Sequence, residues 1–333
     1  PPISRAQAIA ELTAAGQPYA LEEAVINGRR LRIFSNAPPT LRALYESTAS
    51  DLSSIRYDDE HYSFAQAWAA ASRIGHVLVH VCGVKRGDRV AISMRNYPEW
   101  MLAFDAITSI GAIAVAMNAH WQSEELAYGL QDCGAVVLLA DQERLDRLAE
   151  MPALPAAGAA RLQVLAVRPS KPLAAGVRNL ATLTAAVGDV PMPPATIAPD
   201  DAASILYTSG STGHPKGVVS SHRNIISALM SWELDRFIGE RAAGITPPVP
   251  AVQPGTLLAV PLFHVTGLLA SYLAGLRAQR RLVAMYRWDV EAAAKLVDQY
   301  QLSSVIAPSA VTGDLLRVAQ SGRHSLASLQ ALG

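Results

Sequence analysis

A glycine-rich segment in the second half of the chain has the composition of a phosphate-binding loop. Residues 207–218 read Tyr-Thr-Ser-Gly-Ser-Thr-Gly-His-Pro-Lys-Gly-Val. The glycines free the backbone to turn its N–H groups inward, and the hydroxyl side chains add further donors. Lys216 adds a positive charge close to them. The segment is therefore suited to surround the oxygens of phosphate groups.

Two simpler interpretations of this segment carry less weight. Serine, threonine and glycine are ordinary turn residues, so a short segment of this kind would prove little. The common nucleotide loop, G-x-x-x-x-G-K followed by Ser or Thr, does not fit either. Pro215 stands in the place of its second glycine, and Gly217 stands in the place of its hydroxyl residue. The sequence predicts a phosphate loop of a different kind.

Short apolar strands alternate with amphipathic helices from residue 63 onward, and this alternation is typical of parallel sheets covered by helices. With half of its 333 residues hydrophobic, the chain can bury one large core or two ordinary ones. We predict an α/β fold of two stacked subdomains with mostly parallel sheets flanked by helices. The predicted strands are 88–93, 112–117, 135–140, 162–167, 203–207, 257–260 and 303–307. The predicted helices are 97–109, 124–131, 222–232, 268–276, 290–300 and 310–319.

The segments between these elements also carry predictions. Residues 151–201 are rich in alanine and proline and read as surface packing and linker, with the one strand at 162–167. Residues 239–255 contain four prolines and read as a loop. The glycine-rich segment is predicted to be a turn between a strand and a helix, where the two subdomains meet.

Composition excludes several classes of protein. Lys and Arg together number 28, as do Asp and Glu, so no net field attracts a nucleic acid. Cys82 and Cys133 have neither disulfide nor zinc spacing and read as reduced core residues of a cytoplasmic protein. Residues 1–16 do not read as a signal peptide. Residues 255–276 are uncharged, but Pro261, His264 and Gly267 favour a strand, a turn and a helix over a transmembrane span.

Taken as a whole, residues 207–218 closely resemble the signature loop of the adenylate-forming superfamily. This superfamily includes acyl-CoA synthetases, aryl-CoA ligases, luciferases and peptide-synthetase adenylation domains. Further segments resemble its motifs in the same order, namely residues 62–64, 87–91, 110–118 and 261–267. The resemblance extends over residues 62–333, whereas residues 1–61 match only loosely.

The resemblance implies an incomplete large N-terminal domain. Residues 1–61 would be a segment packing on the second subdomain, and residues 62–235 would form the first subdomain, ending in the phosphate loop and its helix. Residues 236–333 would form a truncated second subdomain that carries the acyl-site motif. The adenine-binding strand, the Thr-Glu pair, the ribose Asp and the mobile C-terminal domain with its catalytic Lys have no counterpart in the sequence.

The resemblance also implies an acid–thiol ligase with a two-step reaction. A carboxylate attacks the α-phosphorus of ATP, pyrophosphate leaves, and coenzyme A captures the acyl-AMP as a thioester. Lys216 would be catalytic and would bind ATP phosphates together with Thr208, Ser209, Gly210, Ser211, Thr212 and Gly213. Magnesium is expected, with ligands mostly in the missing part and none assigned in this chain. The fragment alone is expected to be inactive, and a homodimer remains open.

The acyl-site motif indicates the kind of acid. Adenylation domains for α-amino acids typically carry an Asp where this chain has His264, so a buried ammonium would lack a partner. A lone histidine in an apolar stretch is ordinarily a core residue, but within this motif we favour a catalytic and substrate-binding role. The predicted substrate-binding residues are Phe263, His264, Val265, Thr266, Gly267 and Leu268, and they favour a fatty or aryl acid and thus a place in fatty acid metabolism.

Two alternatives stay open. The chain could belong to an adenylation domain that feeds a carrier protein instead of coenzyme A. It could also be a binding module that retains the fold without turnover.

Overall fold

The structure is a computed structural model that describes residues 2–151, 156–157, 160–208 and 213–333. A seven-stranded sheet forms the first half of the molecule, with the strand order β11-β10-β7-β5-β6-β12-β13. All neighbours run parallel except β12 and β13, which pair antiparallel. Its strands are β5 (Arg89–Ser93), β6 (Ile113–Ala116), β7 (Val137–Asp141), β10 (Gln163–Val167), β11 (Val177–Asn179), β12 (Ala202–Thr208) and β13 (Lys216–Ser221).

A six-stranded sheet forms the second half, with the order β17-β16-β14-β15-β3-β4. It is parallel except for the β3–β4 hairpin at its edge. Its strands are β3 (Ser53–Tyr57), β4 (Glu60–Ser63), β14 (Gly255–Leu258), β15 (Arg281–Ala284), β16 (Ser304–Val305) and β17 (Ala331–Leu332). A short antiparallel pair, β8 (Ala156–Ala157) and β9 (Ala160–Arg161), belongs to neither sheet.

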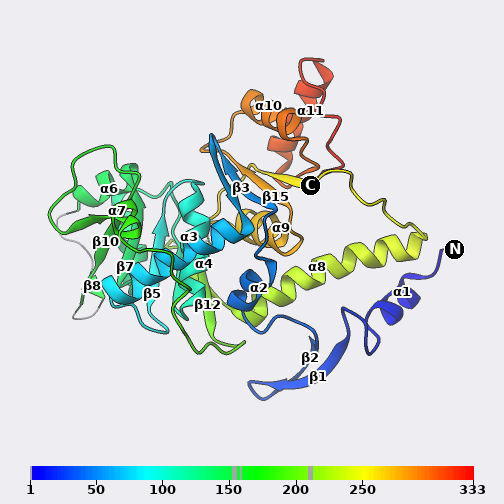
Figure 1. Ribbon diagram of the computed structural model, residues 1–333, viewed down its shortest axis with the longest axis horizontal. Helices are drawn as coiled ribbons and strands as arrows, with labels where there is room; N and C mark the ends of the chain where they lie inside the picture. The colour runs from blue at the N-terminus through cyan, green and yellow to red at the C-terminus, as the bar shows by residue number, and fades with distance from the viewer. Residues whose placement is uncertain (1, 152–155, 158–159, 209–212) are drawn as a thin grey trace.

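A layer of helices lies between the two sheets and forms one continuous core with both (Figure 1). Trp100 and Phe104 of α4 are fully buried in this core, together with Ile92 of the first sheet and Leu282 of the second. The helices that contribute are α2 (Leu41–Thr48), α3 (Phe64–His76), its continuation η1 (Val77–Val81), α4 (Pro98–Ser109), α7 (Leu180–Ala185), α8 (His222–Ala243), η2 (Thr266–Leu273) and its continuation α9 (Ala274–Arg277).

Helices on the two outer faces complete a five-layer arrangement. Helices α5 (Ser123–Cys133) and α6 (Gln142–Ala149) bury Leu126 and Leu148 against the first sheet. Helices α10 (Val290–Tyr300) and α11 (Ser309–Gln320) bury Val297 and Leu315 against the second. Because each sheet is covered on both faces, its central strands are apolar runs rather than alternating ones, and β7 is buried throughout.

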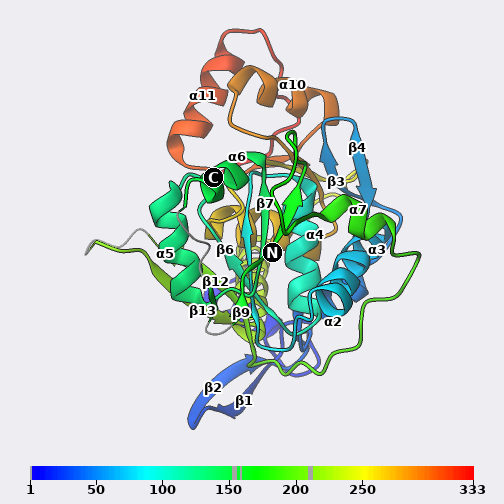
Figure 2. The ribbon, with the colours of Figure 1, turned by 90° about the vertical axis from the view of Figure 1, so that its left-hand side faces the viewer.

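The N-terminal region adds helix α1 (Arg5–Leu12) and the hairpin of β1 (Leu21–Ile26) and β2 (Arg29–Phe34). The hairpin projects from the body of the molecule in both ribbon views (Figures 1 and 2). Helix α1 lies along α8, where the N–H of Ile3 donates to the carbonyl of Ala242 over 3.0 Å. The strands β3 and β4, also early in the sequence, belong to the second sheet.

The predicted fold class is confirmed: two stacked α/β layers with mostly parallel sheets flanked by helices. The uncharged residues 255–276 form β14, η2 and α9, and no helix in the described part of the chain could span a membrane. The three-part division at residues 61 and 235 stays a proposal, because one core runs through both sheets.

Three local predictions were wrong. The glycine-rich segment leads into strand β13, not into a helix, because Val218 and Val219 pair with β12 before α8 begins. The region 151–201 contains β11 and α7 besides the predicted strand. Helix α8 was predicted to end at residue 232, with a loop over residues 239–255. The helix instead continues to Ala243, and Gly244 ends it in the left-handed conformation at φ 66°.

Candidate functional site

The glycine-rich segment connects two antiparallel strands at the edge of the first sheet. Thr208, the last residue of β12, pairs with Lys216, the first residue of β13. The Thr208 hydroxyl donates to the Lys216 carbonyl over 3.3 Å. This bond joins the two ends of the loop, and we call this pair of residues the neck of the loop. Gly213 has φ 109°, which is costly for any residue with a Cβ. Ser209, Gly210, Ser211 and Thr212, predicted to bind phosphate, lie outside the described residues.

Helix α5 anchors both sides of this loop. On one side, the Tyr207 hydroxyl donates to Oδ2 of Asp132 over 2.6 Å, and burial together with this bond raises the pKa of Tyr207. On the other side, the Tyr128 hydroxyl donates to the Pro215 carbonyl over 3.3 Å. The Tyr128 ring also stacks on His214, with centroids 4.6 Å apart. The two ends of the loop are therefore fixed to helix α5.

Gly217 has a packing role between two strands. A Cβ at this position would lie 2.8 Å from Cγ2 of Ile205 on the neighbouring strand. Three glycines were predicted to free the loop backbone, but this one permits close contact between β13 and β12.

The acyl-site motif forms a tight turn after β14. Asn96 holds this turn from the first sheet's side: its Nδ2 donates to the Val260 carbonyl and its Oδ1 accepts from the Leu262 N–H, each over 3.0 Å. Gly267, the second residue of η2, lies so close to the turn that a Cβ would lie 2.2 Å from the Pro261 carbonyl oxygen. The glycine is therefore required by the backbone of the turn.

A cavity of about 600 Å³ brings the two motifs together. Three segments wall it: the loop after β6 with the start of α5, the glycine-rich segment at both ends, and the turn after β14. The lining residues are Asn118, His120, Trp121, Glu125, Leu206, Tyr207, Thr208, Gly213, Pro215, Phe263, His264 and Val265. We call this the larger cavity.

A smaller cavity of about 280 Å³ adjoins it and shares His120 and Phe263 in its lining. These two rings meet edge to face with centroids 5.8 Å apart. The other lining residues are Arg95, Asn96, Leu258, Ala259, Val260, Pro261, Met285, Tyr286, Arg287 and Trp288. His120 and Phe263 thus separate the two cavities.

The two histidines of the larger cavity are biased toward the neutral form. Burial lowers the pKa of His264. Burial, and then the charges of Arg95, Arg144 and Arg147, lower the pKa of His120. A neutral imidazole can donate one hydrogen bond and accept another, so either ring can orient a carboxylate or a carbonyl in the cavity.

The structure places the predicted site residues unequally. Phe263, His264 and Val265 line the larger cavity together with Thr208 and Gly213. Thr266, Gly267 and Leu268 form the first turn of η2, and the last two of these are buried there. Lys216 is exposed at the start of β13 and is not among the described residues that line the cavity.

Several cavity residues that follow β5 and β6 were not predicted from the sequence, among them Asn96, His120 and Trp121. They stand at the carboxyl ends of parallel strands. Ligands of open α/β sheets bind at such ends, so this rule could have pointed to them.

Magnesium finds no built site in the described part of the chain. No group of three or more His, Cys, Asp or Glu side chains there is arranged to hold a metal ion. Of the carboxylates, Glu125 lines the larger cavity. The described donors therefore do not fit a magnesium ion.

Comparison with solved structures supports the fold. A Mycobacterium tuberculosis fatty acyl CoA synthetase superposes with a TM-score of 0.72 at 24% identity, covering 88% of this chain and 54% of the other. The anthranilate CoA ligase AuaEII, solved with anthranoyl-AMP, superposes with a TM-score of 0.74 at 20% identity, covering 88% and 54%.

Curated relatives are CoA ligases. The chain is 26% identical to 4-coumarate–CoA ligase 2 of Oryza sativa subsp. japonica, over 81% of this chain and 47% of the relative. It is 30% identical to the long-chain-fatty-acid–CoA ligase FadD13 of Mycobacterium tuberculosis, over 79% and 45%. The chain thus spans less than half the length of these relatives.

The family model described as AMP-binding enzyme matches residues 38–333, which is most of the chain and includes both motifs and both sheets. This chain belongs to the AMP-binding enzyme family.

Proposed function

We propose that this chain is the ATP- and acid-binding part of an acyl-CoA synthetase that activates a hydrophobic carboxylic acid, fatty or aryl. One observation carries the proposal: the larger cavity is walled by both ends of the glycine-rich segment and by Phe263, His264 and Val265. A nucleotide held by its phosphates at the loop and an acid held at the turn would meet in the larger cavity.

The first step would form acyl-AMP. A carboxylate oxygen bonds to the α-phosphorus of ATP while the bond from that phosphorus to the bridging β-oxygen breaks, and pyrophosphate leaves with the electron pair. Negative charge gathers on the phosphate oxygens, so fixed N–H groups, hydroxyls and a cation lower the barrier. We assign these roles to Lys216 and to residues 208–213. We assign no residue of this chain to magnesium and no step to it.

The second step would transfer the acyl group to coenzyme A. The thiolate attacks the acyl carbonyl carbon, and the bond to the AMP oxygen breaks, which releases AMP. We assign His264 to the carboxyl end of the acid, because it lines the larger cavity as a neutral imidazole that can donate to an oxygen there.

The apolar side chains of Phe263 and Val265 support a hydrophobic acid, and the absence of a carboxylate at position 264 disfavours an α-amino acid. Among relatives, the name of one refers to 4-coumarate and that of another to long-chain fatty acids. We propose a fatty or aryl acid on this basis, with a role in fatty acid metabolism in the cytoplasm. Because the chain spans less than half of these relatives, we also propose that it is inactive alone.

Two measurements test the proposal. Calorimetry of the 333-residue chain with ATP should detect binding, and the chain alone should form no acyl-CoA. The second measurement uses an extended protein, in which the chain continues into the downstream part of its gene. The extended protein should catalyse acid-dependent exchange of pyrophosphate into ATP, with fatty or aryl acids preferred in a panel that includes α-amino acids.

The outcomes separate the alternatives. Exchange without thioester formation on coenzyme A, but with loading of a carrier protein, would favour the carrier-protein alternative. ATP binding without exchange for any acid in the extended protein would favour a binding module. No ATP binding by either protein would overturn the assignment of the glycine-rich segment.

A further inference from the structure

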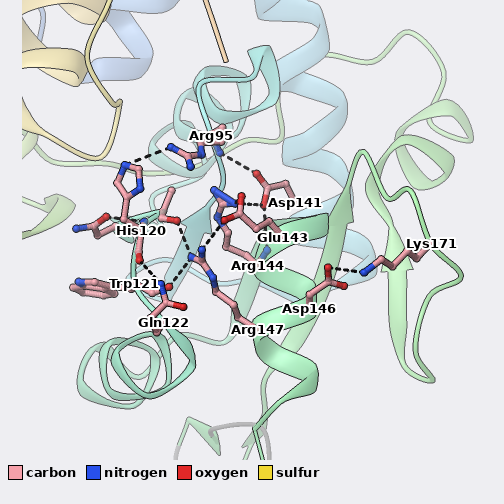
Figure 3. A network of polar contacts seen from close by, with 12 residues as sticks. Arg95, His120, Trp121, Gln122, Asp141, Glu143, Arg144, Asp146, Arg147 and Lys171 are labelled. Carbon is pink, nitrogen blue, oxygen red and sulfur yellow. Dashed lines mark hydrogen bonds and ion pairs between the residues drawn. The ribbon is translucent and has the colours of Figure 1, made fainter. Parts of the chain in front are cut away.

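Helix α6 holds the loop after β6 through a single guanidinium. Nη1 of Arg147 donates to the carbonyl of Ala119 over 2.9 Å and to that of Trp121 over 2.6 Å. Nη2 of Arg147 donates to Oε1 of Glu143, one turn earlier on the helix, over 2.6 Å. Figure 3 shows Arg147 reaching from α6 toward the loop that carries His120, Trp121 and Gln122.

The rest of the loop is held as well. The carbonyl of His120 accepts from Nε2 of Gln122 over 3.2 Å, and the N–H of His120 donates to Oδ1 of Asn118 over 2.8 Å. Three successive carbonyls, at residues 119 to 121, thus have defined donors, two of them from Arg147.

The contacts continue into a closed ring across three loops (Figure 3). Glu143 accepts from Arg144 over 2.5 Å, and Arg144 pairs with Asp141 over 3.3 Å. Asp141 accepts from the N–H of Arg95 over 3.0 Å. Nη1 of Arg95 lies 3.4 Å from Nε2 of His120, which returns the ring to the loop held by Arg147.

Burial distinguishes this ring from ordinary surface ion pairs. The side chain of Arg147 is 13% exposed and that of Arg144 is 1% exposed. On the same helix, Asp146 pairs with Lys171 with exposures of 43% and 61%, and this pair contacts no part of the ring. An exposed pair contributes little, so Lys171 offers a matched control.

The loop held by Arg147 supports both parts of the candidate site. Trp121 packs edge to face on Tyr207 with centroids 5.2 Å apart, and Tyr207 immediately precedes Thr208 at the neck of the glycine-rich segment. His120 lies between the two cavities. A shift of the carbonyls of residues 119 and 121 would therefore move the side chains of His120 and Trp121 together.

We propose that Arg147 is a positioning residue: it fixes the main chain of residues 119–121, and through Trp121 and Tyr207 it sets the base of the glycine-rich segment. The consequence for ATP rests on the function proposed above, whereas the effect on the loop does not.

The test uses the full 333-residue chain with Arg147→Met, which keeps an unbranched apolar stem and removes the donors of the guanidinium. Hydrogen exchange of the amides of residues 119–122 should become about tenfold faster, because a loop released from Arg147 opens more often and exposes its amides to water. Affinity for ATP, measured by calorimetry, should fall about tenfold through the displaced loop base. Lys171→Met should leave both quantities within about twofold of the parent.

Arg147→Lys supplies a rescue. Both carbonyl contacts come from one nitrogen of Arg147, so an ammonium can reproduce them and should recover most of the protection from exchange. If Arg147→Met does not fold, Arg147→Gln, whose stem is too short to reach the carbonyls, gives the same comparison.

Exchange in Arg147→Met that equals exchange in the parent would overturn the proposal, as would equal effects of Met and Lys. Faster exchange at residues 119–122 with unchanged ATP affinity would overturn the coupling to the glycine-rich segment. A parent chain that binds no ATP would overturn the proposed function alone, and exchange at residues 205–208 would then decide whether the coupling exists.

Discussion

The hydroxyl of Tyr272 donates a 2.6 Å hydrogen bond to Oδ2 of Asp105 in the middle of the shared core. This bond joins η2, which follows a strand of the second sheet, to α4, which follows a strand of the first. Burial raises the pKa of Asp105 to about 8. The carboxyl group is therefore protonated in the folded chain at neutral pH.

This raised pKa predicts a stability that decreases as pH rises. The unfolded carboxyl ionises near its ordinary value of 3.8, whereas the folded one holds its proton up to about pH 8. Between these values the folded state binds one more proton than the unfolded state. The free energy of unfolding therefore falls by about 1.4 kcal/mol for each unit by which the pH rises. In Asp105→Asn this contribution should vanish. Urea unfolding at pH 5, 6.5 and 8 checks it, and equal slopes in both proteins would contradict it.

His222 predicts the opposite dependence at acidic pH. Its Nδ1 accepts from the N–H of Leu41 over 3.1 Å, and burial lowers its pKa to about 4. The unfolded imidazole takes up a proton below about 6.5 while the folded one does not, so stability is lost as pH falls from 6.5 to 4. His222→Gln, which keeps an acceptor, should lose less of its thermal midpoint between pH 7 and 4.5. A parallel loss in parent and variant would refute the assignment.

Gly267→Ala should destabilise the chain strongly. The added methyl would lie 2.2 Å from the Pro261 carbonyl oxygen, and backbone must move to admit it, at a cost of about 3 kcal/mol or more. Gly239→Ala is the matched control, since it lies in helix α8 with nothing within 4 Å of the new methyl. That change should be neutral or stabilise by about 0.5–1 kcal/mol. Denaturant unfolding of both variants decides, and similar midpoints would exclude the clash.

His264→Ala in the extended protein should weaken use of the acid more than binding of ATP. The imidazole lines the larger cavity beside Phe263 and Val265, on the turn after β14 and not on the glycine-rich segment. We expect kcat/KM for the acid to fall about a hundredfold while the Kd for ATP stays within about twofold. Steady-state exchange kinetics and calorimetry measure the two, and equal losses would place His264 in a structural role.

Lys216→Ala should slow adenylation with little effect on the acid. Removing a cation from developing charge on the departing pyrophosphate costs roughly 3 kcal/mol, or about a hundredfold in rate. Lys216 is exposed at the neck of the loop, so stability should not change. Pyrophosphate exchange in the extended protein provides the measurement, and an unchanged rate would remove the role given to the lysine.

Local sequence signals predicted most elements downstream of residue 63. Helix α10 was predicted at its observed bounds; Asp289 caps its first turn, and Ala293 and Val297 are buried on one face. Strand β13 was missed, since its first residues belong to the glycine-rich segment, which was predicted to be a turn as far as Val218. Its two valines gain their position only from the pairing with β12.

The candidate site was predicted only where one segment carries it. Phe263, His264 and Val265 adjoin in sequence and line the larger cavity together. Asn96 bonds to Leu262 across 166 positions, and Arg147 bonds to Ala119 across 28. No local pattern encodes such pairs, because the fold alone brings them into contact. The binding roles of Lys216 and His264 stay predictions until a ligand is measured.

The topology of the second sheet sets the order in which its paired strands are synthesised. Ile55 of β3 pairs with Leu282 of β15, so an early hairpin of the second sheet waits for a partner made more than two hundred residues later. At about 5–20 residues per second this interval lasts on the order of ten seconds or more. Once α4 has been made, Trp100 and Phe104 have no complete second sheet to cover them until the end of this interval. We therefore expect the apolar face of α4 to stay exposed to water until the second sheet has been synthesised.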